Sequence, residues 1–188
     1  MMNFKKIGLT VMAFSFAIFT GSTTLQTSDG KDDEGGNETY REIDDFTESS
    51  AEFEALFNVT GEDIIENAMK YLGRPYRRGT AGPYTFDCSG FTSFVYGNNN
   101  ISLSRSSKTQ FTQGVKVSRD ELREGDLVFF TSPGSGRGVG HVGIVTEVKP
   151  DGNFCFVHAA RRGIKVDNFA SSGYYNRRYL GARRILDY

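Results

Sequence analysis

The chain has 188 residues, 38% of them hydrophobic and 13% aromatic, which suits one ordinary globular domain with additional segments. The net charge of −1 conceals an uneven distribution. Residues 29–62 hold twelve Asp/Glu and two Lys/Arg, whereas residues 63–188 hold eighteen Lys/Arg and eleven Asp/Glu. An acidic leader therefore precedes a basic body. The body contains no Lys/Arg-rich helix and no RNA-binding motif, so we expect no nucleic-acid partner, while other anionic polymers remain open.

The first 25 residues have the layout of a secretory signal peptide. Lys5 and Lys6 precede an uncharged, mostly apolar run of thirteen residues (7–19), and small residues follow it. A run of this length is too short to span a bilayer as a helix. We therefore expect an exported protein, cleaved between about residues 20 and 28, without stable membrane insertion afterwards. A short membrane anchor is the alternative.

Residues 26–58 are acidic and rich in Gly, Asn, Ser and Thr, a composition typical of a disordered linker. The folded domain is expected to occupy residues 59–188. Thr60 is suited to cap its first helix, with Asp63 in the position of a capping box. Gly73 is expected to end this helix. Its apolar stripe consists of Ile64, Ile65, Ala68, Met69 and Leu72.

A lone cysteine, Cys88, stands at the start of a second amphipathic helix. Asp87 is a good N-cap, which places Cys88 in the first turn, where free backbone N–H groups and the helix dipole favour an anion. This setting lowers a thiol pKa and produces a nucleophile. A buried structural cysteine is the alternative. The chain has one other cysteine, Cys155, so a single disulfide is a third possibility and a four-cysteine zinc site is excluded.

Both histidines of the chain fall on a predicted β-hairpin. Residues 141–148 and 153–158 have strand patterns, and Lys-Pro-Asp-Gly between them is a turn. If those four residues form the loop, His158 lies opposite Gly143 and becomes a diagonal neighbour of His141 on one face. Cys155 then points to the other face as an apolar filler.

Two histidines on one face, together with a candidate nucleophile, match the nucleophile, base and orienter of cysteine hydrolases. Either histidine alone is more often an ordinary surface or hydrogen-bonded residue. A buried strand is also predicted at Leu127–Phe130, after a Gly-Asp turn.

Taken in order, these segments resemble the NlpC/P60 family of cell-wall peptidases over about residues 62–186. The matching pieces are Gly-Arg-Pro-Tyr (73–76), Phe-Asp-Cys-Ser-Gly-Phe (86–91), Leu-Ser-Arg-Ser (103–106) with Gln110, residues 125–130, His-Val-Gly-Ile (141–144), Val-His-Ala (157–159) and Arg-Arg-Ile (183–185).

The resemblance implies a papain-like α+β fold, in which the cysteine helix packs on an antiparallel sheet. It implies Cys88 as nucleophile, His141 as base and His158 as the residue that orients the base. Tyr76 corresponds to a tyrosine that lines the site and contributes to the oxyanion hole. Asp87 and Ser89 correspond to residues that contact substrate, including a free amino end. The chemistry needs no metal and no cofactor.

Family members cleave peptidoglycan stem peptides, often between γ-D-glutamate and a diamino acid such as meso-diaminopimelate. The resemblance therefore implies a periplasmic or extracellular enzyme associated with the cell wall, and we expect it to be a monomer. Two other reactions remain open on this fold, an amidase that cuts the sugar–peptide link and a transpeptidase. A non-catalytic wall-binding or toxin-like module is a further alternative.

The sequence departs from the family pattern in a few places. The family's Leu-Pro-Arg is Leu-Ser-Arg at 103–105, and a Gly-Gly pair is Gly-Thr at 79–80. We find no SH3-like or LysM-like domain in residues 29–61.

Overall fold

The computed structural model describes residues 58–186. The predicted signal peptide (1–25) and all but the last residue of the predicted linker (26–58) lie outside this part of the chain. The described elements are α2 (Gly61–Met69), α3 (Cys88–Gly97), α4 (Ser107–Gln110), β1 (Val115–Val117), the 3₁₀ helix η1 (Arg119–Glu121), β2 (Leu127–Phe130), β3 (His141–Val148), β4 (Phe154–Ala160), β5 (Gly163–Asn168), α5 (Gly173–Asn176) and β6 (Tyr179–Arg184).

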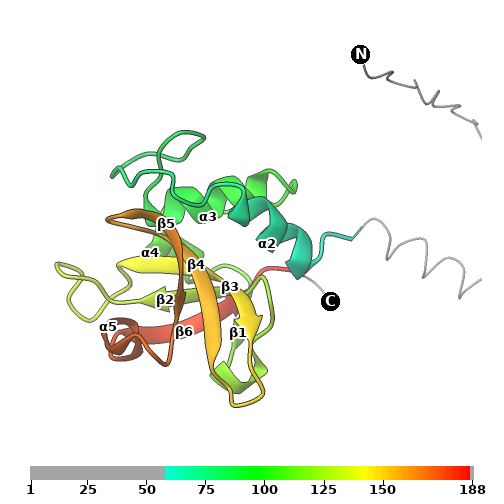
Figure 1. The fold of residues 1–188 in the computed structure, drawn as a ribbon, viewed down its shortest axis with the longest axis vertical. Helices are drawn as coiled ribbons and strands as arrows, with labels where there is room; N and C mark the ends of the chain where they lie inside the picture. The colour runs from blue at the N-terminus through cyan, green and yellow to red at the C-terminus, as the bar shows by residue number, and fades with distance from the viewer. Residues whose placement is uncertain (1–57, 187–188) are drawn as a thin grey trace, which may run out of the picture. The chain divides into compact units, whose positions relative to one another are not determined.

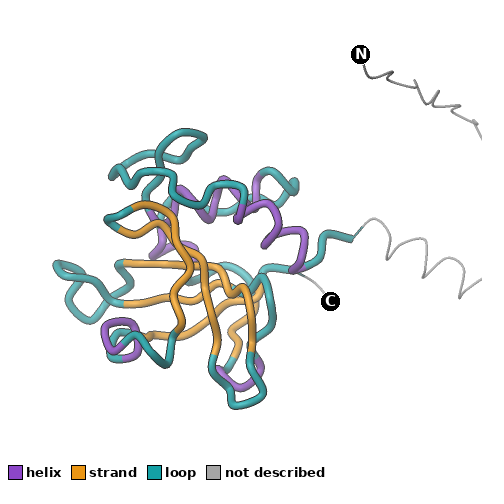
Figure 2. Tube along the Cα trace, in the orientation of Figure 1, coloured by secondary structure: helices purple, strands orange, loops and turns teal. Residues whose placement is uncertain are grey.

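The six strands form one antiparallel sheet in the order β1-β6-β2-β3-β4-β5. Helices α2 and α3 lie together against one face, and α5 lies toward the other (Figures 1 and 2). The α3 side has a core that includes Phe86, Phe91 and Ile144. A second core, with Phe130 and Phe156, fills the opposite face. The fold is therefore the papain-like α+β arrangement that the family resemblance implied.

Helix α2 begins as predicted but ends early. The Thr60 hydroxyl accepts a hydrogen bond from the Asp63 backbone N–H, and the Asp63 carboxylate accepts from the Thr60 N–H, which completes the capping box. The helix stops at Met69, and turns lead to Gly73, which has a positive φ of 78°. Only the first part of the predicted stripe is in the core, since Leu72 is 46% exposed.

The hairpin of β3 and β4 has the predicted register at the histidine end but not at the turn. Ile144 pairs with Val157, which places His158 beside Gly143, as expected. Near the turn, Val148 pairs with Phe154 rather than with residue 153. A bulge at Thr146 absorbs the one-residue difference. The prediction of a four-residue turn was therefore wrong, because Asn153 belongs to the loop.

The sequence analysis did not identify β1, β5 or α5. Strands β1 and β5 complete the sheet, and α5 lies toward the face opposite α3. Strand β5 returns along β4 after a tight turn at residues 161–162, with His158 paired to Lys165. Within residues 58–186, no helix is long and apolar enough to cross a bilayer.

Candidate active site

Cys88 is the first residue of α3, and Asp87 caps the helix by accepting a hydrogen bond from the Gly90 N–H at 2.8 Å. Both features were predicted. Glycine is required at position 90 because a Cβ atom there would collide with the Thr80 carbonyl and press on the Arg105 guanidinium. The start of α3 is thereby held closely against the loop that precedes it.

The thiol of Cys88 is half-buried, and both cysteines of the chain are free. Burial raises the pKa of Cys88, and the negative charge of Asp87 raises it further. The backbone N–H groups of Ser89, Val142 and Cys88 itself favour the thiolate but do not reverse the shift. The expected lowering of the thiol pKa is therefore wrong for the free site, because burial and Asp87 outweigh the helix N-terminus.

His141 is the first residue of β3, directly before the Val142 N–H that reaches the Cys88 sulfur. Its Nε2 lies 2.9 Å from Nδ1 of His158, with the two rings nearly perpendicular. Burial lowers the pKa of His141 to about 3, with a further contribution from His158, while Asp167 opposes the shift. The imidazole of His141 is therefore neutral near pH 7. Gly143 leaves the room that the His158 and Phe156 side chains need on this face.

His158 is fully buried on β4 and makes a second side-chain contact, from Nε2 to Oδ2 of Asp167 at 3.0 Å. Burial lowers the pKa of His158, although the Asp167 carboxylate opposes this. The hydrogen bond from His158 lowers the pKa of Asp167 to about 2 despite partial burial, and Lys165 contributes as well. Asp167 is therefore a carboxylate, and it ends a hydrogen-bonded series that begins at His141.

Tyr175, on α5, closes the other side of the histidine pair. Its ring stacks on His141 with centroids 5.7 Å apart and an angle of 26°, and its hydroxyl lies 3.4 Å from Nδ1 of His158. Burial raises the pKa of Tyr175 above its usual range, so the phenol stays protonated. Phe130 and Phe156 pack against the same ring. The histidines thus lie in an aromatic enclosure.

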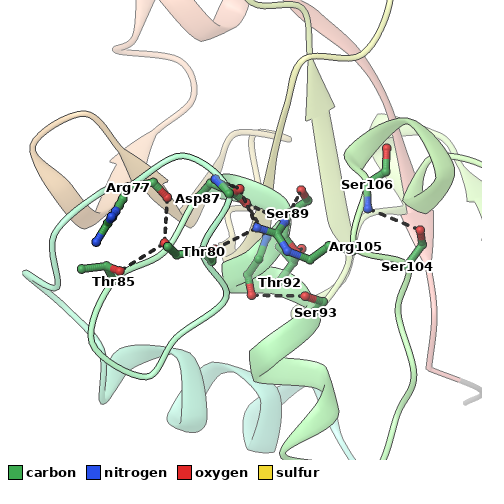
Figure 3. Close-up of polar contacts among 12 residues, drawn as sticks. Arg77, Thr80, Thr85, Asp87, Ser89, Thr92, Ser93, Ser104, Arg105 and Ser106 are labelled. Carbon is green, nitrogen blue, oxygen red and sulfur yellow. Dashed lines mark hydrogen bonds and ion pairs between the residues drawn. The ribbon is translucent and has the colours of Figure 1, made fainter.

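Asp87 and Ser89 flank the cysteine and are held by Arg105 (Figure 3). The Arg105 guanidinium donates to both oxygens of Asp87 at 2.8 and 2.6 Å and to the Ser89 hydroxyl at 3.1 Å. The Gly79 and Gly90 N–H groups also donate to Asp87. Burial alone raises the pKa of Asp87, but these donors outweigh burial and hold the pKa below its usual value. Four protein donors thus hold the Asp87 carboxylate in place.

Tyr76 lies in the loop before α3, where its backbone forms an isolated β-bridge with Phe86. Its side chain is 37% exposed. Its pKa is raised, first by burial and then by the charges of Cys88 and Asp87. The structure therefore places Asp87 and Ser89 on either side of Cys88, with Tyr76 in the loop before α3, and brings His141 into contact with His158 at the start of β3.

The sequence analysis missed Asp167 and Tyr175, and it included Arg105 only as part of a motif. A usable signal existed for Asp167. A tight turn after β4 places Lys165 opposite His158 and puts Asp167 two residues further along, on the same face. Nothing in the sequence indicates α5, which has four residues. Among residues 58–186, no group of three His, Cys, Asp or Glu side chains is arranged to hold a metal ion.

Comparison with known proteins places the chain in a family. Residues 73–184 match the NlpC/P60 family. A probable endopeptidase p60 from Listeria seeligeri is 45% identical over 111 residues, covering 59% of this chain and 20% of the relative. A gamma-D-glutamyl-L-lysine dipeptidyl-peptidase from Bacillus cereus is 37% identical over 126 residues, covering 66% of this chain and 36% of the relative.

A solved structure has the same fold. The NlpC/p60 domain of the peptidoglycan hydrolase SagA superposes with a TM-score of 0.56 and 31% sequence identity, covering 67% of this chain and 99% of that domain. The chain thus spans only about a fifth to a third of the length of the curated relatives named above, and 99% of the solved SagA domain. The family match covers more than half of the sequence, and the chain belongs to the NlpC/P60 family.

Proposed function

We propose that the protein is a peptidoglycan hydrolase, a cysteine endopeptidase that cleaves stem peptides at the bond between γ-D-glutamate and a diamino acid. The observation that carries the proposal is the contact of 2.9 Å between His141 and His158, next to Val142, whose backbone N–H favours the thiolate of the half-buried Cys88. The name of the B. cereus relative supports the γ-D-glutamyl specificity. For this chain, meso-diaminopimelate and lysine are the candidate diamino acids.

In the proposed mechanism, His141 is the general base. Its Nε2 is engaged by His158, so Nδ1 is the nitrogen left for the thiol proton. Cys88 attacks the amide carbonyl as His141 takes that proton, and the imidazolium then gives it to the leaving amine. Water, activated by the same imidazole, hydrolyses the resulting thioester and restores the thiol.

Backbone N–H groups at the start of α3 are the proposed donors to the developing oxyanion, with the Tyr76 hydroxyl as a second donor. They are fixed before the reaction, because Asp87 and Arg105 hold the first turn in place. Loss of one such donor typically reduces the rate by about 10²–10³-fold.

Asp87 and Ser89 remain proposed neighbours of the substrate. Because Arg105 and two backbone N–H groups already occupy the Asp87 carboxylate, a substrate amine that binds there has to displace or share these donors. Tyr76 is more readily accessible, since 37% of its surface is exposed. We also propose export by the predicted signal peptide and action as a monomer at the cell wall.

The test is mass spectrometry of muropeptides and of L-Ala-γ-D-Glu-meso-diaminopimelate after incubation with the purified protein. We expect the dipeptide L-Ala-γ-D-Glu from the wild type and none from Cys88→Ala. Cys155→Ala is the matched control, because it removes the other free thiol, and it should cleave as the wild type does.

Each alternative gives a different product. Release of intact stem peptide from muramic acid indicates an amidase, and extended or exchanged peptides indicate a transpeptidase. If wild type and Cys88→Ala bind cell wall equally and neither forms a product, the protein is a non-catalytic binding module.

A further inference from the structure

A carboxylate lies at the far end of the histidine pair, on a strand that the proposed mechanism does not use. Asp167 of β5 contacts Nε2 of the fully buried His158 at 3.0 Å. Nδ1 of the same ring contacts Nε2 of His141 at 2.9 Å. Three side chains from three neighbouring strands therefore form one continuous series that ends at His141, the residue before Val142, whose backbone N–H favours the Cys88 thiolate.

The hydrogen-bonding capacities of these groups determine where the protons are. An ionised carboxylate only accepts, so His158 must donate its Nε2–H to Asp167. A neutral imidazole carries one proton, so Nδ1 of His158 is then an acceptor. His141 must therefore donate through its own Nε2–H. The Nδ1 lone pair of His141 stays free, as a general base requires.

We propose that Asp167 is a positioning residue, which sets the tautomers of both histidines and so keeps the basic nitrogen of His141 available for the Cys88 thiol. This inference rests on the proposed function for its kinetic consequences, but the tautomers themselves do not depend on any substrate. Asp167 also places a negative charge where it can stabilise the imidazolium that forms when His141 accepts the thiol proton.

The other groups that face this series fit the same reading. Lys165 contacts the Asp167 carboxylate at 2.8 Å from the exposed side and helps to keep it ionised. The Tyr175 hydroxyl, 3.4 Å from Nδ1 of His158, can donate to that nitrogen only if the nitrogen is unprotonated. Both contacts are consistent with Nε2–H tautomers.

A purely structural role for Asp167 is the competing explanation, since its ion pair with Lys165 lies within β5. The two explanations differ in what Lys165→Met should do. If the ion pair is what matters, this variant behaves like Asp167→Ala. If the contact to His158 matters, Lys165→Met keeps the wild-type tautomers, whereas Asp167→Ala loses them.

The chain suits a direct measurement because it contains only two histidines. Two-bond ¹H–¹⁵N correlation spectra of protein labelled with ¹⁵N-histidine should show two neutral Nε2–H imidazoles at pH 7 in the wild type. In Asp167→Ala this preference should be lost. Asp151→Ala is the matched control: it removes a carboxylate that accepts one backbone N–H in the turn at the other end of the β3–β4 hairpin.

Kinetics on the stem peptide supply the second readout. We expect Asp167→Ala to lower kcat/KM by about 10–100-fold, mainly through kcat, because residues that orient a site from the second layer typically have effects of this size. Asp167→Glu, which keeps the acceptor, should restore part of the rate. Wild-type tautomers together with a wild-type kcat/KM in Asp167→Ala would overturn the proposal.

If Asp167→Ala does not fold, the isosteric Asp167→Asn takes its place. Its neutral amide no longer stabilises the imidazolium, so kcat/KM should fall at least about tenfold, and an unchanged value contradicts the role of Asp167. The two proposals fail separately. If the wild type has Nε2–H tautomers that Asp167→Ala abolishes, but the wild type does not hydrolyse the stem peptide, the positioning role is supported and the proposed function is rejected. If the wild type cleaves the stem peptide but the histidine tautomers are the same in Asp167→Ala, the proposed function is supported and the positioning role is rejected.

Discussion

Without substrate, the thiol of Cys88 and the imidazole of His141 are both neutral near pH 7. Burial raises the pKa of Cys88 and lowers the pKa of His141 to about 3, so both shifts oppose a resting thiolate–imidazolium pair. Attack therefore requires the proton to move as the sulfur approaches the carbonyl. This proton transfer makes His141 a cation. The Asp167 carboxylate favours that cation and so reduces the energetic cost of the transfer.

The first prediction concerns the pH dependence of kcat/KM for stem-peptide cleavage. The base must be unprotonated, and a lowered pKa keeps His141 unprotonated at all pH values above about 3. Activity should thus persist at pH 5 and decline only as the pH falls toward that value. An unperturbed histidine would instead give an acid limb near 6.5.

Circular dichroism over the same pH range separates titration of the site from acid unfolding. An acid limb between pH 6 and 7 in a folded protein would show that His141 is solvated or paired with a thiolate in the active state, and would contradict the neutral imidazole.

At the scale of elements, the segment before α3 is held by one charged cluster. Asp87 caps the helix, and Arg105 connects this cap to the Thr80 carbonyl and to Ser89 (Figure 3). The cluster joins the loop at residues 77–87 to the chain that leads into α4. Its stability should therefore determine how well the cysteine is positioned.

Replacement of Asp87 by alanine should lower the free energy of unfolding by about 1–3 kcal/mol. Loss of an N-cap typically costs about 1 kcal/mol. The remainder comes from Arg105, whose contribution is limited because 43% of its side chain is exposed. Urea unfolding followed by circular dichroism measures the difference.

Ser106→Ala is the matched control, since Ser106 stands at the N-cap of α4 but its side chain makes no capping hydrogen bond. It should change the unfolding free energy by less than about 0.5 kcal/mol. Equal losses in the two variants would mean that the Asp87 cluster contributes nothing specific.

The β3–β4 hairpin shows how a sequence-based register succeeds at one end and fails at the other. Alternation of apolar residues indicated the strands, and the turn residues indicated a loop of four. The loop has one residue more, because Asn153 is outside β4, and the bulge at Thr146 compensates for it. Bulges have no reliable sequence signature. The sequence analysis made the loop one residue too short and missed the bulge, and these two errors cancel at the end of the hairpin where His141 meets His158.

At the scale of the whole molecule, sequence patterns predicted the elements with strong caps or long apolar runs, namely α2, α3, β2, β3 and β4. They did not predict β5 or α5. Strand β5 alternates charged and apolar side chains at an exposed edge of the sheet, and α5 has four residues held by tertiary contacts. Asp167 and Tyr175 lie on these two elements, so the nucleophile and histidines were predicted and both supporting residues were missed, although a strand predicted after β4 would have indicated Asp167.

The two cores share one sheet, and this arrangement leads to the last prediction. Phe91 is fully buried on the α3 face and Phe156 is fully buried on the α5 face. Replacing either by alanine should cost about 3–5 kcal/mol. Because every strand contributes to a common hydrogen-bonded sheet, loss of packing on one face should lower the urea midpoint of the entire domain without changing the m-value.

Far-UV circular dichroism and tyrosine fluorescence test this together, since the chain has nine tyrosines and no tryptophan. The two signals should give coincident transitions in Phe91→Ala and in Phe156→Ala. If Phe156→Ala instead produces an early transition in one signal while the other stays at the wild-type midpoint, the α5 face unfolds on its own. His158 and Tyr175 would then be attached to a layer that opens independently of Cys88, and the relative placement of nucleophile and base would depend on that opening equilibrium rather than on the sheet.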